Sequence, residues 1–218
     1  MRVGFLGGTG TEAKGLALRF AAAGARVVLG SRLQERAVNA AEDYCRLLGQ
    51  PLFEGATNRD VLSACGLVFL TVPFDKAVSV VEACRSDFPQ KLVLVDVTVP
   101  MRFRDGQAEY VEQEGKSNAE VIADHLPAGV DLVAAFKTIP AHLLAETGKP
   151  LDCDLFVCGE SPAAKQTVID AARTITTLRP LDAGPLRNAR ILERMTILVA
   201  QLNRRHKSKD ARYRIVGI

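Results

Sequence analysis

Short apolar runs alternate with longer stretches of helical periodicity along most of the chain. The runs that we predict to be strands are 2–6, 26–29, 51–54, 67–72, 92–97, 132–135 and 155–158. Most of them are continuously apolar rather than alternating, as expected where helices cover both faces of a sheet. Strands separated by helical segments indicate βαβ units. We therefore predict an α/β fold of the Rossmann type, with a doubly wound, mostly parallel sheet and a C-terminal helical extension.

The prediction also includes two connections and two helices, with a third helix near the C-terminus. Residues 101–116 break the pattern and are predicted to be a long loop, either a lid over a site or a mobile surface loop. Ser117-Asn118-Ala119-Glu120 has the form of a capping box at a helix start, and Ser161-Pro162 starts a helix that runs to about Thr174. Residues 178–185, rich in Pro and Gly, are predicted to be a connection.

The C-terminal part of the chain is predicted to be helical from Leu186 to Arg205. One face of that helix is apolar, and it carries Ile191, Leu192, Met195, Leu198, Val199 and Leu202. This stripe packs either within the chain or across a homodimer. We expect a dinucleotide-binding domain over 1–182 and a helical extension over 183–218 that completes a substrate cleft.

Composition excludes several classes of protein. Of the 218 residues, 48% are hydrophobic and 24% charged, and the net charge is only +3, so nothing suggests a nucleic-acid partner. No apolar run approaches the roughly 20 residues of a membrane span, and we expect a cytoplasmic protein. The five cysteines are scattered, with no C-x-x-C and no clustered histidines. We therefore expect neither a disulfide framework nor a metal site.

A glycine-rich turn follows the first predicted strand. Gly7-Gly8-Thr9-Gly10-Thr11-Glu12-Ala13 lies between an apolar run and a helical stretch, and from Gly8 it reads G-x-G-x-x-A. In this setting the motif is typical of a dinucleotide site, with the pyrophosphate at the positive end of the helix. The carboxylate of Glu12 would weaken phosphate binding unless its side chain points away.

The residues after the second predicted strand favour NADP over NAD. An NAD site usually has Asp or Glu at this point to bind the ribose 2′-hydroxyl. Here the sequence is Gly30-Ser31-Arg32, with Arg36 four residues later on the same predicted helical face. Arginine binds a 2′-phosphate with paired hydrogen bonds, which a carboxylate would repel. The alternative is that both arginines are ordinary solvated surface residues.

Three predicted strands end in the same pattern of threonine, a β-branched residue and proline. The copies are 71–73, 98–100 and 138–140. Proline cannot continue a central strand but suits the first turn of a helix, so each copy indicates the carboxyl end of a strand. Ligands of open α/β sheets bind beyond those ends. We expect a shared, mostly apolar wall against which two flat rings could stack.

Together these residues resemble one family, the NADPH-dependent reductases of the deazaflavin coenzyme F420. The similar segments are 7–10, 30–32, 71–73, 138–140, 158–159 and Leu178-Arg179-Pro180-Leu181-Asp182-Ala183-Gly184-Pro185-Leu186, the last being the most specific. The resemblance implies hydride transfer between NADP(H) and F420, without a metal. It implies a cofactor site made by Thr9, Gly10, Thr11, Glu12, Ser31, Arg32, Arg36, Val72, Phe74, Val78, Val99, Lys137, Thr138, Ile139 and Pro140.

We assign no catalytic acid or base, since direct hydride transfer between stacked rings depends mainly on proximity and orientation. Lys137 stands where archaeal members carry histidine, and its ammonium would stabilise negative charge on a reduced deazaflavin or indicate a different acceptor. Two other hypotheses remain. One is a reductase of the same fold acting on a flavin, a ferric chelate or an imine, and the other is an NADP-binding redox sensor without turnover.

Overall fold

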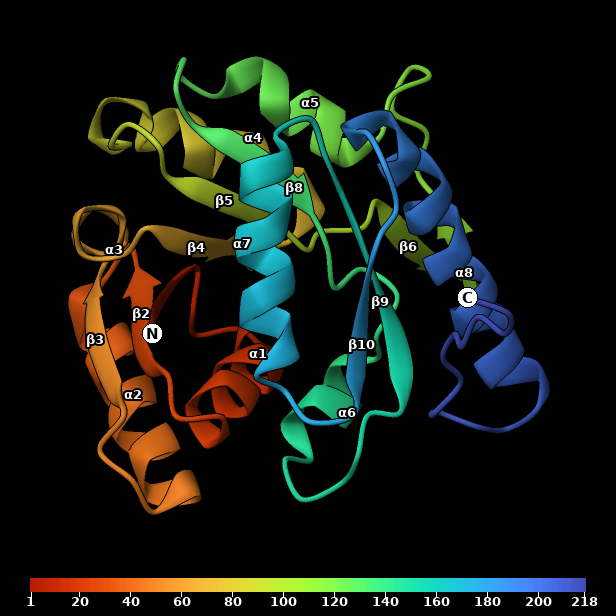
Figure 1. Ribbon diagram of the computed structural model, residues 1–218, viewed down its shortest axis with the longest axis horizontal. Coiled ribbons are helices and arrows are strands. Elements are labelled where there is room, and N and C mark those ends of the chain that lie inside the picture. The colour runs from red at the N-terminus through yellow and green to blue at the C-terminus, as the bar shows by residue number, and fades with distance from the viewer.

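The protein, described over all 218 residues by a computed structural model, is built on one eight-stranded sheet (Figure 1). The strand order is β10-β9-β8-β5-β4-β1-β2-β3. The strands are β1 Arg2–Leu6, β2 Arg26–Ser31, β3 Phe53–Thr57, β4 Leu67–Leu70, β5 Val93–Asp96, β8 Asp131–Ala134, β9 Cys153–Gly159 and β10 Leu178–Asp182. The helices are α1 Thr11–Ala22, α2 Gln34–Leu48, α3 Asn58–Ala64, α4 Phe74–Ala83, α5 Asn118–His125, α6 Ala141–Ala145, α7 Pro162–Arg173 and α8 Ala189–Arg205.

The sheet is mostly parallel and doubly wound, as predicted. Every neighbouring pair is parallel except β8 and β9, which run antiparallel. From β1 the chain proceeds outward through β2 and β3, then returns to β4 on the other side of β1 and continues outward through β5 and β8. The winding therefore reverses between β1 and β4. In open α/β sheets, ligands bind beyond the strand ends at such a reversal.

Two hydrophobic cores lie on opposite faces of the sheet. One contains buried residues of α1, α2, α6 and α7, and the other contains those of α3, α4, α5 and the start of α8. Strand residues alternate between the two cores: Val3 and Phe5 face the first, and Leu6 and Leu70 face the second. Burial on both faces explains why the strands are continuously apolar in the sequence.

Two predicted connections are in fact strands. The predicted loop at 101–116 contains an antiparallel hairpin of β6 Met101–Arg104 and β7 Gln107–Tyr110, with a turn at Asp105-Gly106. Its strands are short and largely exposed, so they lack the apolar pattern of the main sheet. The predicted connection at 178–185 begins with the edge strand β10, which pairs with β9. Pro180 is compatible with this strand because an edge strand needs bonding on only one side.

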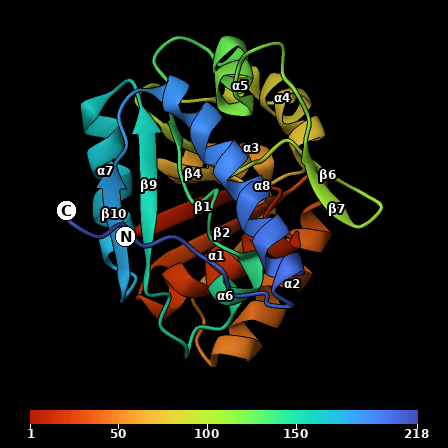
Figure 2. The same ribbon diagram turned by 90° about the vertical axis from the view of Figure 1, so that its right-hand side faces the viewer.

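Helix α8 runs beside the hairpin and crosses the carboxyl ends of the central strands (Figure 2). Its apolar stripe is divided: Leu192 and Val199 are buried within the chain, whereas Ile191 and Leu198 are exposed. The predicted capping box at Ser117 and Glu120 and the cap at Ser161 are both formed. No helix has the length and apolar character needed to cross a membrane.

Candidate functional site

The glycine turn between β1 and α1 has the geometry of an anion cradle. Gly7 has φ +73°, a conformation that favours glycine, and the Gly8 amide donates to the Gly30 carbonyl at 2.8 Å. Gly10 precedes the first residue of α1, and a Cβ built on it would have no other heavy atom closer than 3.8 Å. The backbone at Gly10 is thus open to a ligand at the positive end of a helix.

One cavity lies beside this turn, and we call it the arginine cavity. It has a volume of about 560 Å³, and Thr9, Gly10, Ser31, Arg32 and Arg36 are among its lining residues. Both arginine side chains are exposed, and no Asp or Glu lines the cavity. Arg32 precedes α2 and Arg36 lies in its first turn, so the two do not share a helical face as predicted, yet both line one cavity that suits an anion.

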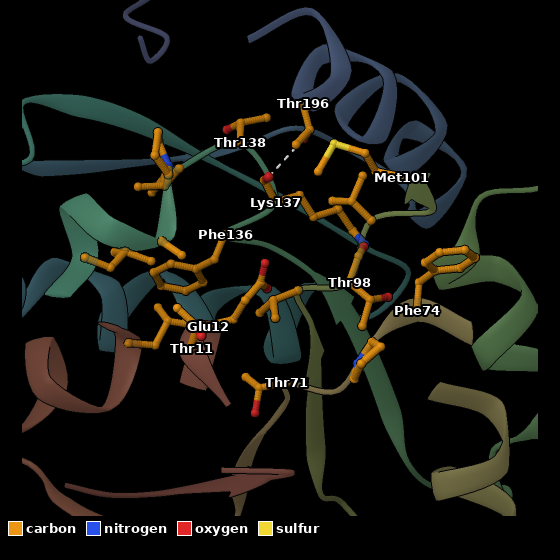
Figure 3. Close-up of a pocket in the computed structure, with 18 of the residues that line it drawn as sticks. Thr11, Glu12, Thr71, Phe74, Thr98, Met101, Phe136, Lys137, Thr138 and Thr196 are labelled. Atoms are coloured by element: carbon orange, nitrogen blue, oxygen red, sulfur yellow. Dashed lines mark hydrogen bonds between the residues drawn. The ribbon is translucent and has the colours of Figure 1, made fainter. Parts of the chain in front are cut away.

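A second cavity, of about 530 Å³, lies beyond the carboxyl ends of β4, β5 and β8, and we call it the apolar cavity (Figure 3). These three strands are adjacent in the sheet, so the three Thr-x-Pro ends converge as predicted. Helices α6 and α8 close the side of the cavity that faces these strand ends. The lining includes Thr71, Val72, Pro73, Phe74, Val97, Thr98, Val99, Phe136, Thr138, Ile139, Pro140, Leu144, Thr196, Val199 and Asn203.

The two cavities adjoin at the point where the sheet reverses. Gly10, Thr71, Val72 and Pro73 line both of them. An extended ligand can therefore pass from the arginine cavity, along the N-terminus of α1, into the apolar cavity.

Glu12 points away from the glycine turn. Its side chain lines the apolar cavity and not the arginine cavity, and Figure 3 shows the carboxylate directed into the cavity near Phe136 and Thr98. Glu12 is exposed to solvent at the open cavity, although protein atoms crowd its carboxyl group. Burial raises the pKa of Glu12, the charge of Lys137 lowers it in part, and the charge of Asp96 raises it further. The predicted conflict with phosphate is thus avoided.

Lys137 is one of the residues that line the apolar cavity, but its ammonium is turned away from the cavity and is not available to a reduced ring. Its side chain is wholly buried, with Nζ 2.6 Å from Asp96 Oδ2 and 3.3 Å from Glu193 Oε1, and it also donates to the Thr98 carbonyl. Burial lowers the pKa of Lys137, but the two carboxylates outweigh this effect and raise it. The ammonium is therefore committed to an internal ion cluster under the cavity wall.

This cluster joins elements that are far apart in the sequence. The second oxygen of Glu193, on α8, accepts from Tyr110 Oη at 2.8 Å and from the Asn118 amide at 3.1 Å. Asp96 accepts from the hydroxyl and amide of Thr98. The predictions omitted Asp96 and Glu193, because a single acid in an apolar run does not reveal its partner.

Phe136 is another lining residue that the sequence did not suggest. It has φ +59°, unusual for a residue other than glycine, and its ring packs edge-on against Phe20 and Phe69 at centroid distances of 6.1 and 5.7 Å. The aromatic packing holds this strained residue in place next to Lys137. From α8, Thr196 Oγ1 donates to the Lys137 carbonyl at 2.9 Å (Figure 3).

Two predicted features lie elsewhere. Val78 lines neither cavity and packs against the core on the α4 face. No residue of 178–186, the most specific part of the resemblance, lines either cavity. Arg179 instead binds the buried Asp154 through two nitrogens, and Asp182 pairs with Lys165. Residues 178–186 therefore stabilise the edge of the sheet.

The comparisons with known proteins agree on one family. A family model described as NADP oxidoreductase coenzyme F420-dependent matches residues 2–100. The F420-dependent NADP reductase of Methanothermobacter thermautotrophicus is 36% identical over 223 residues, covering 100% of this chain and 96% of the relative. That of Methanocaldococcus jannaschii is 33% identical and covers 100% and 99%.

More distant matches share parts of the chain or only the fold. The rat metalloreductase STEAP3 is 32% identical over 192 residues, which are 88% of this chain but 36% of that protein. A crystal structure from Arthrobacter sp. FB24 has a TM-score of 0.84 at 23% identity, with both chains fully covered, and shows that the fold is shared.

Proposed function

The chain belongs to the family of F420-dependent NADP reductases, and we propose that it transfers a hydride between NADP(H) and the deazaflavin coenzyme F420. The observation that carries this proposal is the pair of adjoining cavities, one with two arginines and no carboxylate, the other mostly apolar. In NADP, the 2′-phosphate suits the cavity with two arginines, and the nicotinamide ring suits the mostly apolar cavity.

In this proposal the 2′-phosphate of NADP lies against Arg32 and Arg36, with the Ser31 hydroxyl nearby. The pyrophosphate lies at the Gly10 end of α1, where free amides and the helix dipole favour negative charge. The nicotinamide then enters the apolar cavity, past Val72 and toward Ile139. The walls fit these groups, since Gly10 leaves its backbone open and no acid lines the arginine cavity.

The second ring system, the deazaflavin, occupies the remainder of the apolar cavity, between the strand ends and α8. Thr196, Val199 and Asn203 supply the α8 side of that wall. The two coenzymes supply the hydride chemistry, and the protein supplies proximity, orientation and exclusion of water. The residues that line the cavity thus act by holding the two flat rings in contact.

The test is reduction of oxidised F420 by NADPH. With the full chain present, we expect the absorbance of oxidised F420 to disappear and NADPH to be consumed in equal amounts. The same assay with free flavin and with a ferric chelate, the chemistry named for the metalloreductase relatives, serves as the comparison. Activity with those acceptors and none with F420 would show that the substrate is one of those acceptors and not F420. Tight NADP binding with no acceptor reduced would indicate a redox sensor.

Two finer predictions accompany this proposal. A homodimer would use the exposed half of the α8 stripe, where Ile191 is 60% and Leu198 is 49% exposed. Light scattering on the chain and on its Leu198→Lys variant tests this. A cytoplasmic location accords with five cysteines that are all free, and cell fractionation tests it.

A further inference from the structure

Glu12 is the ionisable group that opens into the apolar cavity from the N-terminus of α1. The strand ends that face it are mostly apolar, and Asp75, the other carboxylate of the lining, lies in the first turn of α4 beside Lys76. The resemblance counts Glu12 among the residues of the cofactor site but gives its carboxylate no function of its own. Its chemistry therefore needs its own explanation.

Lys137 offsets the charge of Glu12 only in part. Lys137 is bound to Asp96 from β5 and to Glu193 from α8, so this cluster pairs one positive charge with two carboxylates. The cluster as a whole carries no surplus positive charge to offer the cavity. A carboxylate that opens into a mostly apolar cavity, with its one neighbouring cation bound elsewhere, holds its proton more tightly than one in water, in agreement with the raised pKa of Glu12.

The proposed cofactor changes charge at this place. Because the two cavities join at Gly10, an NADP held by Arg32 and Arg36 brings its nicotinamide past α1 and into the cavity that Glu12 lines. The reduced ring is neutral and the oxidised ring is a cation. A neutral ring displaces part of the water around Glu12, which favours the protonated acid, whereas a cation favours the carboxylate.

We propose that Glu12 senses the oxidation state of the nicotinamide, being protonated beside NADPH and ionised beside NADP+. This inference rests on the proposed NADP site. Exchange of the neutral reduced ring for the oxidised ring would break the O–H bond of Glu12, leave its electron pair on the carboxylate and pass the proton to water at the open cavity. The ionised side chain then acts as the counter-ion of the oxidised ring.

Proton release on binding tests the proposal without turnover. Calorimetric titration of the full chain with NADP+ and with NADPH, in buffers of different ionisation enthalpy, measures the protons exchanged in each case. The 2′-phosphate also titrates near neutral pH, but it is common to both nucleotides, so the difference between them isolates the ring. Between about pH 5 and 8, we expect NADP+ binding to release up to one more proton per chain than NADPH binding.

Glu12→Gln should abolish that difference while retaining both nucleotides. It should weaken NADP+ binding roughly tenfold, the equivalent of one pKa unit, and change NADPH binding little. Asp75→Asn, a carboxylate removed from another part of the same lining, should leave the proton difference intact. In the unaltered chain, NADP+ should gain affinity relative to NADPH as pH rises through the pKa of Glu12, then level off.

Three results would overturn the inference. The first is equal proton release by both nucleotides in the unaltered chain, and the second is an unchanged difference in Glu12→Gln. The third is loss of the difference in Asp75→Asn, which would transfer the role to Asp75. If neither nucleotide binds, the proposed function fails as well, so the two failures are distinguishable.

Discussion

The ammonium of Lys137 lies 2.6 Å from Asp96 Oδ2, and neither side chain has any exposed surface. Lys137 follows β8 and Asp96 ends β5, so this ion pair joins two adjacent strand ends that form the floor of the apolar cavity. Glu193 adds the C-terminal helix to the same cluster at 3.3 Å. The cavity wall is therefore stabilised by charged side chains that are buried beneath it and do not face the cavity.

Removing the Lys137 charge should destabilise the fold strongly. Lys137→Met leaves Asp96 and Glu193 buried without their cation, and breaking a buried pair in this way costs about 3–5 kcal/mol. Urea unfolding measures the loss. Lys149→Met, which removes an exposed lysine paired with Glu146, should change the stability little, because solvent screens exposed ion pairs. Adding Asp96→Asn to Lys137→Met should recover part of the loss, and a further loss would contradict this account.

Arg32 should distinguish NADPH from NADH. Arg32→Ala removes a charge-assisted contact to the 2′-phosphate, so NADPH should bind about 10- to 100-fold more weakly. NADH, which lacks that phosphate, should change by less than roughly twofold. Nicotinamide fluorescence gives both dissociation constants. Arg46→Ala, on α2 and paired with Asp43 outside the arginine cavity, is the matched control. Equal losses for both nucleotides would show that Arg32 does not contact the 2′-phosphate.

Glu120 should make stability depend on acid pH. Two hydrogen bonds from Arg190, with further bonds from Ser117, lower the pKa of Glu120 to about 2. Because the folded pKa lies below the ordinary value of 4.5, the stabilisation is present above that value and is lost as pH falls toward 2. We expect roughly 1–2 kcal/mol, reduced from the full shift because solvent screens the partly exposed Arg190.

The stability difference between the unaltered chain and Glu120→Gln measures this effect. It should be largest near about pH 6 and should shrink by about pH 3. Glu112→Gln, which breaks the exposed pair with Arg194, should show a small and nearly constant difference. A Glu120→Gln difference that does not change with pH would contradict the assignment.

Arg19 should hold α6 against α1. Its guanidinium donates to the carbonyls of Leu143, Leu144, Glu146 and Thr147, at the end of that short helix. Arg19→Met leaves several of these carbonyls without a partner and should cost about 2–4 kcal/mol. Because α6 forms one wall of the apolar cavity, nucleotide affinity should fall as well. Arg173→Met, which removes an exposed pair with Asp170, should stay within about 0.5 kcal/mol.

The sequence by itself determined the features that depend on neighbouring residues. The apolar runs predicted the central strands, because residues buried on both faces must be apolar. The turn at Gly7–Gly10 and the sequence Gly30-Ser31-Arg32 predicted an NADP site, because turn conformation and anion binding are set by local chemistry. The division at residue 182 stays a prediction, although α8 residues beyond that point complete the apolar cavity.

Only the tertiary structure decided where certain side chains point and what they meet. Glu12 lies at the start of a helix beside a phosphate cradle, and nothing in its sequence neighbours sends its carboxylate into the other cavity. Lys137 is withdrawn from the cavity because Asp96 and Glu193, far away in the sequence, reach it there. A hydrophobic pattern records that a position is buried. It does not record which distant charge lies beside it, because that depends on how the strands and α8 are arranged.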